Sequence, residues 1–296
     1  MTTLTRTPKE GEVECQLSDL LFDVEMRDNP MPSNSEYSKI IIGQLGGGDF
    51  FLNACSPRYE LVMNTDIFPN IEGVLKANNI EFTVSYSHID NVRFYADYVI
   101  TDSRFSYRMK GSNDVINPLI RVQHSYNGLT KYRIIFGYFR FICGNGLVVA
   151  VEEMKKYNLC IVGKHTEIIR KSFYMLDEML KFFAANAAVV VYDLTAKYEM
   201  LGGRMVDKVE DRILEVLNAN KIIAVDNKKF STVDSILRTI TTEANNPVLG
   251  YQGKVNDWLV YNGINQYLFD DNRNIVAPEL RMDKDSSVFE YMLAHA

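Results

Sequence analysis

The sequence predicts an α+β protein with an antiparallel β-rich N-terminal half, which carries a protruding hairpin, and a helical C-terminal half. Between residues 92 and 141 apolar side chains recur at every second position, a spacing typical of strands with one buried face. Beyond residue 163 they recur every three or four positions, as on amphipathic helices. We therefore expect a loosely ordered leader (1–36), a β-rich domain with the hairpin (37–162) and a helical region packing on it (163–296). The two halves either share one core or form two lobes.

Composition indicates a globular chain. Its 296 residues are 47% hydrophobic and 24% charged, which excludes a disordered, collagenous or coiled-coil protein. No run approaches the roughly 20 apolar residues that span a bilayer, and the N-terminus lacks a signal-peptide pattern. We therefore expect a cytoplasmic protein with no membrane partner. Four scattered cysteines without a CxxC pair predict neither a disulfide framework nor a zinc site.

Turn residues and alternation assign the elements of the β-rich half. Three consecutive glycines, residues 46–48, predict a turn between strands, because the Gly-Lys-Ser/Thr ending of a phosphate loop is missing. A helix is expected over 67–79, and strands over 92–100 and 104–110. The last of these strands alternates basic and apolar side chains, so it has one basic face, formed by Arg104, Arg108 and Lys110.

The hairpin is predicted by Asn127-Gly128, because both residues tolerate the positive φ of a two-residue loop. With this loop, Arg121 pairs with Ile134. The tip is then polar and basic, and too few apolar groups surround it to hold it in a core. We therefore expect it to protrude and to leave Tyr126 free to stack on a base.

Helical spacing and capping residues dominate the C-terminal half. Thr166 is a candidate N-cap, and Gly202-Gly203 is a candidate end point for the helical pattern that follows it. Helices are expected over residues 166–183, 205–220, 231–246 and 254–269, and residues 184–201 either continue the first of these or form a helix of their own.

Charge is distributed unevenly along the chain. Residues 1–92 carry 6 Lys/Arg against 14 Asp/Glu, residues 93–171 carry 13 against 6, and residues 172–296 carry 13 against 18. The net charge of −6 therefore conceals a basic middle segment. Such a segment indicates either an anion-binding surface or a fluctuation on a solvated face, and charge alone does not separate the two.

Patterns that carry catalytic or metal chemistry are missing. The four histidines share no ligand spacing with cysteines or carboxylates, so we expect no metal site and no cofactor. Cys143 lies among apolar neighbours, which favours a small buried core residue over a reactive thiol. No catalytic residue is assigned.

Basic and aromatic side chains on the same strands remain as the main functional signal. A positive sheet can follow a phosphate backbone, and aromatic faces stack on bases without reading sequence, so the combination is suited to single-stranded nucleic acid. The candidate contacts are Arg93, Arg104, Arg108, Lys110, Arg121, Tyr126, Lys131 and Arg133.

Two short motifs resemble those of a known family. The turn Ser125-Tyr126-Asn127-Gly128 precedes a strand that ends in Arg-x-x-Cys-x-Asn-Gly-Leu at Arg140–Leu147. This arrangement is similar to that of the phage and plasmid proteins grouped as domain of unknown function 932. The resemblance implies a mobile-element context, in a bacterial or phage-infected cell, and a structural role for the motif residues Asn127, Gly128, Arg140, Cys143, Asn145 and Gly146.

These observations lead to three hypotheses. The first is a phage- or plasmid-encoded homo-oligomer that binds single-stranded DNA in recombination or replication, with a looser fold-level analogy to phage single-strand annealing proteins. The second is a structural or host-interaction protein of a phage, whose basic segment contacts an acidic partner. The third is an enzyme that uses Cys143.

Overall fold

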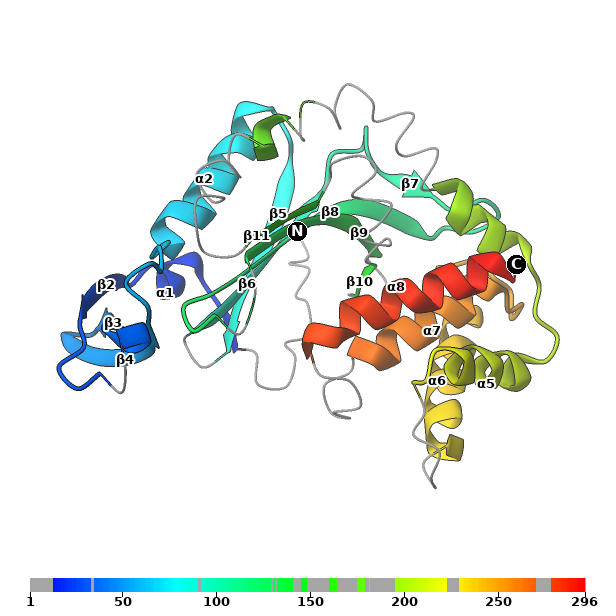
Figure 1. Cartoon of the computed structure of the whole chain (residues 1–296). Coiled ribbons are helices and arrows are strands. Elements are labelled where there is room, and N and C mark those ends of the chain that lie inside the picture. Colours follow the sequence, from blue (N-terminus) through cyan, green and yellow to red (C-terminus); the bar gives the residue numbers. More distant parts are fainter. Residues whose placement is uncertain are drawn as a thin grey trace.

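The computed structural model confirms the α+β class, with antiparallel strands mostly in the N-terminal half and helices in the C-terminal half (Figure 1). It describes residues 13–32, 35–89, 92–128, 130, 132–140, 145–147, 160–163, 175–178, 181, 195–222, 229–269 and 278–295. In these parts of the chain, no helix is long and apolar enough to cross a membrane.

The main sheet has eight strands, all paired antiparallel. Its strands run in the order β1, β5, β6, β8, β9, β10, while β11 also pairs with β9 and β7 pairs with β8. The bounds are β1 Val13–Cys15, β5 Phe82–Ile89, β6 Arg93–Ile100, β7 Tyr107–Arg108, β8 Val115–Ser125, β9 Tyr132–Arg140, β10 Asn145–Leu147 and β11 Cys160–Gly163.

A second sheet of three strands lies at the end of the molecule opposite the C-terminal helices (Figure 1). It consists of β2 (Asp23–Asp28), β3 (Lys39–Leu45) and β4 (Gly48–Cys55). Because Leu45 pairs with Gly48, the two intervening glycines form the turn, and their φ values of 59° and 82° suit residues without a Cβ. The glycine run is thus a hairpin turn, as expected.

The leader is more regular than the sequence suggested. Residues 13–28, expected to be loosely ordered, contain β1, the short helix α1 (Leu17–Leu20) and β2. β1 pairs with β5 and β2 pairs with β3, so both strands extend sheets whose other strands come later in the chain. The 3-10 helix η1 (Ser35–Tyr37) then leads into β3. The expected loose leader is therefore wrong for these residues.

One face of the main sheet is apolar and packs against α2 and the small sheet. Helix α2 (Asn64–Ala77) lies close to the predicted 67–79, and its Phe68 meets Tyr86 of β5 edge-on at 5.6 Å. Phe22, between α1 and β2, lies 6.1 Å from Phe94 of β6. We call this side the apolar face; its buried members include Phe94, Tyr98, Ile120, Val122, Tyr132 and Ile134.

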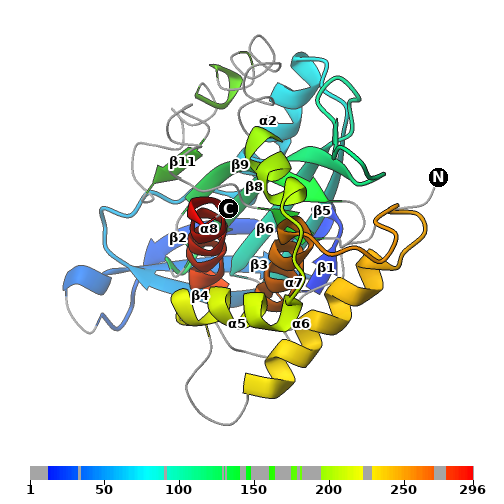
Figure 2. The same cartoon turned by 90° about the vertical axis from the view of Figure 1, so that its right-hand side faces the viewer.

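The C-terminal helices form a compact group beside the far end of the sheet (Figures 1 and 2). They are α5 (Val209–Ala219), α6 (Lys229–Ala244), α7 (Asp257–Phe269) and α8 (Pro278–Ala294). Helices α5, α6 and α7 confirm three predicted segments, whereas α8 was missed, and the predicted helix over 166–183 lies mostly outside the described residues. Most buried apolar side chains of the sheet and the helices belong to one cluster, and Val99 with Leu119 forms a second, small one.

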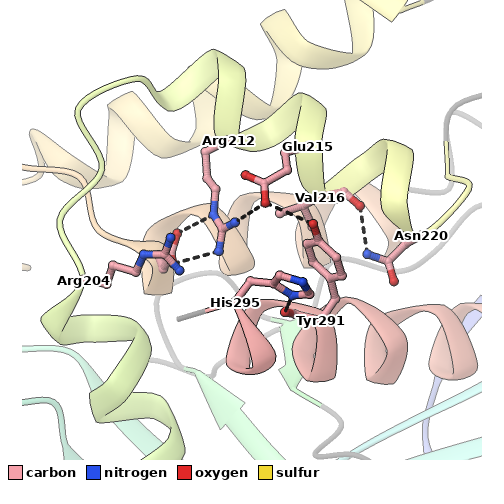
Figure 3. Close-up of polar contacts among 8 residues, drawn as sticks. Arg204, Arg212, Glu215, Val216, Asn220, Tyr291 and His295 are labelled. Carbon is pink, nitrogen blue, oxygen red and sulfur yellow. Dashed lines mark hydrogen bonds and ion pairs between the residues drawn. The ribbon is translucent and has the colours of Figure 1, made fainter.

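Buried carboxylates hold these helices in place. Asp114, just before β8, accepts hydrogen bonds from the indole of Trp258 in α7 and from the Tyr251 hydroxyl, both at 3.0 Å. Within the helical group, Arg212 makes two 3.0 Å bonds to buried Asp257. Figure 3 shows that the same guanidinium also reaches Glu215, which accepts a further bond from Tyr291 of α8. These contacts tie α5, α7 and α8 together.

The β8–β9 hairpin is present, but its register differs from the prediction by one residue. Arg121 faces Ile135 and not Ile134, because the connection between Ser125 and Tyr132 is longer than two residues. The Ser125 hydroxyl closes this longer loop by accepting from the Thr130 N–H at 3.1 Å and donating to the Thr130 carbonyl at 2.8 Å. A shift of one residue exchanges the two faces of β9 relative to β8.

Candidate nucleic-acid interface

The second face of the main sheet is built from alternate residues of four strands; it is polar toward the hairpin loop and also holds the buried apolar side chains of Val99, Leu119 and Ile135. Directly paired residues share a face, so the register places Ser87, Tyr95, Gln123 and Arg133 in one row across β5, β6, β8 and β9. The next rows hold Arg93 with Ser125, and Asp97 with Arg121. We call this side the polar face.

A buried ion pair lies at the centre of the polar face. The Arg121 guanidinium binds both carboxylate oxygens of Asp97, at 2.7 and 2.8 Å, and both side chains are at most 6% exposed. Because the guanidinium binds both carboxylate oxygens, each charge compensates the other, and either charge would be costly to bury without its partner. Arg121 was predicted to contact phosphate, but the structure instead places it inside the protein with its charge already balanced.

Two further arginines, Arg93 and Arg133, lie on the same face nearer the hairpin loop. Both are half-buried, as are Tyr95 and Gln123 between them. Arg93 and Arg133 are two strands apart and one row apart, which corresponds to roughly 12 Å between Cα atoms.

Arginine is the most frequent charged residue among the described members of the polar face. Among its described members in β5, β6, β8 and β9, three arginines face one carboxylate, that of Asp97. Glu14 of β1, opposite Ser87, adds a second carboxylate at the far edge of the sheet. Asp97 is bound to Arg121, and the two other arginines of this face, Arg93 and Arg133, lie nearer the hairpin loop.

The segment from 102 to 110 carries a second, more exposed basic group, formed by Arg104, Arg108 and Lys110. Only Tyr107–Arg108 is a strand, so the predicted strand over 104–110 is too long. The expected alternation nevertheless holds, since Phe105 and Met109 are buried between the exposed basic residues. We call these three residues the edge group.

Acidic neighbours reduce the charge of the edge group. Arg104 binds Asp102 through its Nε at 2.9 and 3.0 Å, and this contact lowers the pKa of the Asp102 carboxyl. Glu199, in the helical stretch 195–203, accepts a bond from the Lys110 backbone N–H at 2.9 Å and another from the Tyr107 hydroxyl. Arg108 and Lys110 keep exposed side chains.

Tyr126 is fully buried, which contradicts the expectation that it could stack on a base. Its ring lies 5.1 Å from both Phe94 and His124, and its hydroxyl accepts the backbone N–H of Asn64 at 3.0 Å. Burial raises the pKa of the Tyr126 hydroxyl. Asn53 of β4 also donates to the Tyr126 carbonyl at 3.2 Å. The β8 end of the hairpin is thus packed against the small sheet.

The structure describes the backbone of both motifs in part. Gly128 has a φ of 71°, the conformation expected at the loop glycine. Arg140 of β9 is the antiparallel partner of Asn145 in β10, and Phe139 is that of Gly146, so the second motif turns the chain back along β9. Asn127 is half-buried in the loop.

Two predicted residues, Lys131 and Cys143, lie outside the described residues, so their roles stay predictions.

In the part of the chain that the structure describes, no cluster of three or more histidine, cysteine or acidic side chains could hold a metal ion. The free thiol of Cys15 has its pKa raised to about 11, mainly by burial and also by Asp19 and Glu14.

The sequence reasoning missed the polar face as a unit. Its signal was present, because Arg93, Tyr95 and Asp97 alternate along one strand, and Arg121 and Gln123 alternate along another. Recognising the face required the pairing of β6 with β8, which joins residues more than 20 positions apart in the chain.

Comparison with known families places the chain in one of them. Residues 51–279 match the model of the family described as Domain of unknown function (DUF932), so the chain belongs to this family. Neither the curated proteins nor the solved structures contain a match to the chain.

Proposed function

We propose that this chain is a nucleic-acid-binding protein that holds a single strand on the hairpin end of its polar face. The observation that carries the proposal is the gathering of arginine there: Arg93 and Arg133 lie one row and two strands apart on the face whose central arginine, Arg121, is paired with Asp97. A protein with a net charge of −6 that gathers cations on one sheet face concentrates positive potential where an anionic ligand can use it.

The composition of the face favours a single strand over a duplex. Tyr95, half-buried between the two arginines, replaces Tyr126 as the aromatic side chain that can stack on a base. Neighbouring Gln123 can donate or accept hydrogen bonds at base edges. The exposed edge group is a second place where a phosphate backbone can bind, although Asp102 and Glu199 lower its net charge.

The wider proposal keeps the biological setting implied by the family resemblance. In it, the protein is phage- or plasmid-encoded, acts in the cytoplasm of a bacterial cell in recombination or replication, and works as a homo-oligomer. No cofactor is required, because binding of this kind depends on charge and stacking alone.

Fluorescence anisotropy with a labelled single-stranded oligonucleotide, titrated in salt, tests the proposal. Replacing Arg93 and Arg133 together by Gln should weaken binding and reduce the slope of log affinity against log salt by about 1.4, because each phosphate contact contributes about 0.7. The matched control replaces Arg58 and Lys76, two exposed cations away from the polar face, by Gln and should leave the slope unchanged.

Two results would overturn the proposal. If the wild type shows no salt-dependent binding to single-stranded DNA or RNA, the structural or host-interaction hypothesis takes its place. If both double variants lose the same affinity, the binding is a general surface effect and the polar face is not its site. Replacement of the edge group by Gln shows whether Arg104, Arg108 and Lys110 extend the same binding surface.

A further inference from the structure

The small sheet has two edge strands of very different character. On β2, four of six residues are charged, Asp23, Glu25, Arg27 and Asp28, and such charges are a common means of preventing edge-to-edge association. On β4, one of eight residues is charged, and this residue, Asp49, is bound to Arg27 at 2.6 Å. Among the described residues, β4 pairs with β3 alone. β4 is therefore the less protected edge.

The same edge exposes large apolar side chains. Phe51 in β4 is 62% exposed, and Leu45, beside the glycine turn, is 58% exposed. Phe51 lies on the outer side of the small sheet, opposite Ile42, whereas Phe50 points inward and packs on Phe22 at 5.4 Å. The inner face of the small sheet is thus filled from within the chain, and the outer face at β4 is not.

We propose that β4 is a self-association surface, on which the β4 strand of a second copy pairs antiparallel across a two-fold axis near Phe51. A two-fold axis perpendicular to the sheet keeps the same face outward in both copies, so the two Phe51 rings meet and are removed from water. Backbone N–H and C=O groups along the edge supply the remaining contacts. The result is a continuous six-stranded sheet.

Charge selects a second copy over other partners. A surface that meets itself across a two-fold axis must not carry net charge, because each charge would face its own kind. β4 carries a single charged side chain, Asp49, which is bound to Arg27, and because Arg27 also binds Glu25 of β2 the charge near this edge is small. With the axis at Phe51, the two Asp49 residues lie roughly 13 Å apart along the strands, beyond the screening length at physiological salt. A strongly charged partner protein would find only this one charged side chain on β4.

One feature limits the strength of this contact. The register shift between Ile41 and Ile42 leaves Leu52 as an extra residue in β4, and such a bulge bends and twists an edge strand. The paired segment on each side of the axis is therefore short. We expect a dimer whose population depends on protein concentration.

Light scattering after size-exclusion chromatography of the full chain gives the first test. The wild type should rise above the 33.9 kDa monomer mass as its concentration increases, and Phe51→Lys should remain monomeric over the same range. The substitution should be tolerated by the fold because the side chain is exposed. The matched control is Met31→Lys, another exposed apolar residue, 88% exposed and outside β4, which should dimerise like the wild type.

Disulfide cross-linking gives a second measurement, because a covalent bond traps a dimer even when its affinity is low. Opposite Cβ atoms in paired strands lie about 4.5–5.5 Å apart, within the range of a disulfide. Under mild oxidation Phe51→Cys should form a covalent dimer, whereas Leu45→Cys, on β3 opposite Gly48 and so away from the pairing edge, should not do so above the wild-type background. A wild type that stays monomeric at every concentration, or a Phe51→Lys variant that still dimerises, would overturn the proposal.

This inference can fail independently of nucleic-acid binding. The monomeric Phe51→Lys variant should still bind a short labelled oligonucleotide, because Arg93 and Arg133 lie on the other sheet. Absence of oligonucleotide binding in every variant would refute the proposed function while leaving the mass measurements intact. Loss of the dimer on adding oligonucleotide would show that the two contacts compete, contrary to their separate locations.

Discussion

The two faces of the main sheet come from the same four strands, yet different interactions bury them. On the apolar face, Phe94, Tyr98, Tyr126 and Tyr132 are 0% exposed and pack ring against ring or against apolar neighbours. On the polar face, the ion pair of Asp97 with Arg121 is buried beside the apolar Val99, Leu119 and Ile135, while the arginines nearer the hairpin loop are half-buried. The apolar face stabilises the sheet, and the polar face combines a stabilising centre with an accessible charged end.

The comparison shows that residues of the same type, here three arginines, have different roles on this sheet. Arg93, Arg121 and Arg133 share one face, and Arg121 is buried there with both guanidinium contacts on the Asp97 carboxylate, whereas Arg93 and Arg133 are half-buried nearer the loop. Because the partner lies 24 residues away in the chain, the difference among the three arginines arises from strand pairing.

Breaking the ion pair should produce the largest effect. Arg121→Ala leaves the Asp97 carboxylate buried without its partner, and we expect a loss of about 3–5 kcal/mol in the free energy of unfolding. Urea denaturation measures this loss. The double variant Arg121→Met with Asp97→Leu removes both charges and should recover most of it. A single variant as stable as the wild type would mean that water reaches Asp97.

The apolar face can be tested at Tyr126. Tyr126→Phe keeps the ring contacts with Phe94 and His124 but removes the acceptor for the buried Asn64 N–H, the first residue of α2. We expect the free energy of unfolding to fall by about 1–3 kcal/mol, the cost of an unsatisfied buried donor. Thermal denaturation, with oligonucleotide affinity measured in parallel, checks this. A large loss of affinity without a loss of stability would restore Tyr126 as a binding residue.

Most of the architecture was predictable because it follows from local patterns. The alternation of β6, the glycine turn between β3 and β4, and the spacing of α5, α6 and α7 all depend on neighbours within a few residues. Residues 13–28 were misjudged for the opposite reason: β1 pairs with a strand about 70 positions later, and its three residues carry no clear alternation.

The candidate site was predictable only in part. The basic residues were identified by type, but the assumption of a two-residue loop shifted the hairpin by one position. Tyr126 then seemed exposed, although it is covered by Phe22 of the leader and bonded to Asn64 of α2. Contacts between segments so far apart leave no periodic trace in the sequence.

The hairpin loop that sets this register can be tested with two Gly→Ala substitutions that should change the free energy of unfolding in opposite directions. Gly128 has a φ of 71°, and a Cβ there would meet nothing within 4 Å, so Gly128→Ala should cost about 1–2 kcal/mol through backbone strain alone. Gly73 in α2 also has open space around it, without a positive φ. Gly73→Ala should therefore stabilise the protein by about 0.5–1 kcal/mol. Equal effects at the two glycines would contradict the loop geometry.

The smallest expected change in stability belongs to Arg133, and it separates the two kinds of arginine on the polar face. Arg133→Gln removes a half-buried charge at the hairpin end while keeping a polar side chain, so the free energy of unfolding should change by no more than about 0.5 kcal/mol. Its effect should appear in binding instead, as a weaker affinity for single-stranded oligonucleotide and a salt slope lower by about 0.7. Arg121→Met with Asp97→Leu should give the reverse result, with the salt slope unchanged, since that pair contributes no net charge. Urea denaturation and anisotropy on the same preparations compare the two variants directly. If Arg133→Gln instead destabilises the protein as strongly as Arg121→Ala, then both arginines hold the sheet together and the positive charge of the polar face is structural.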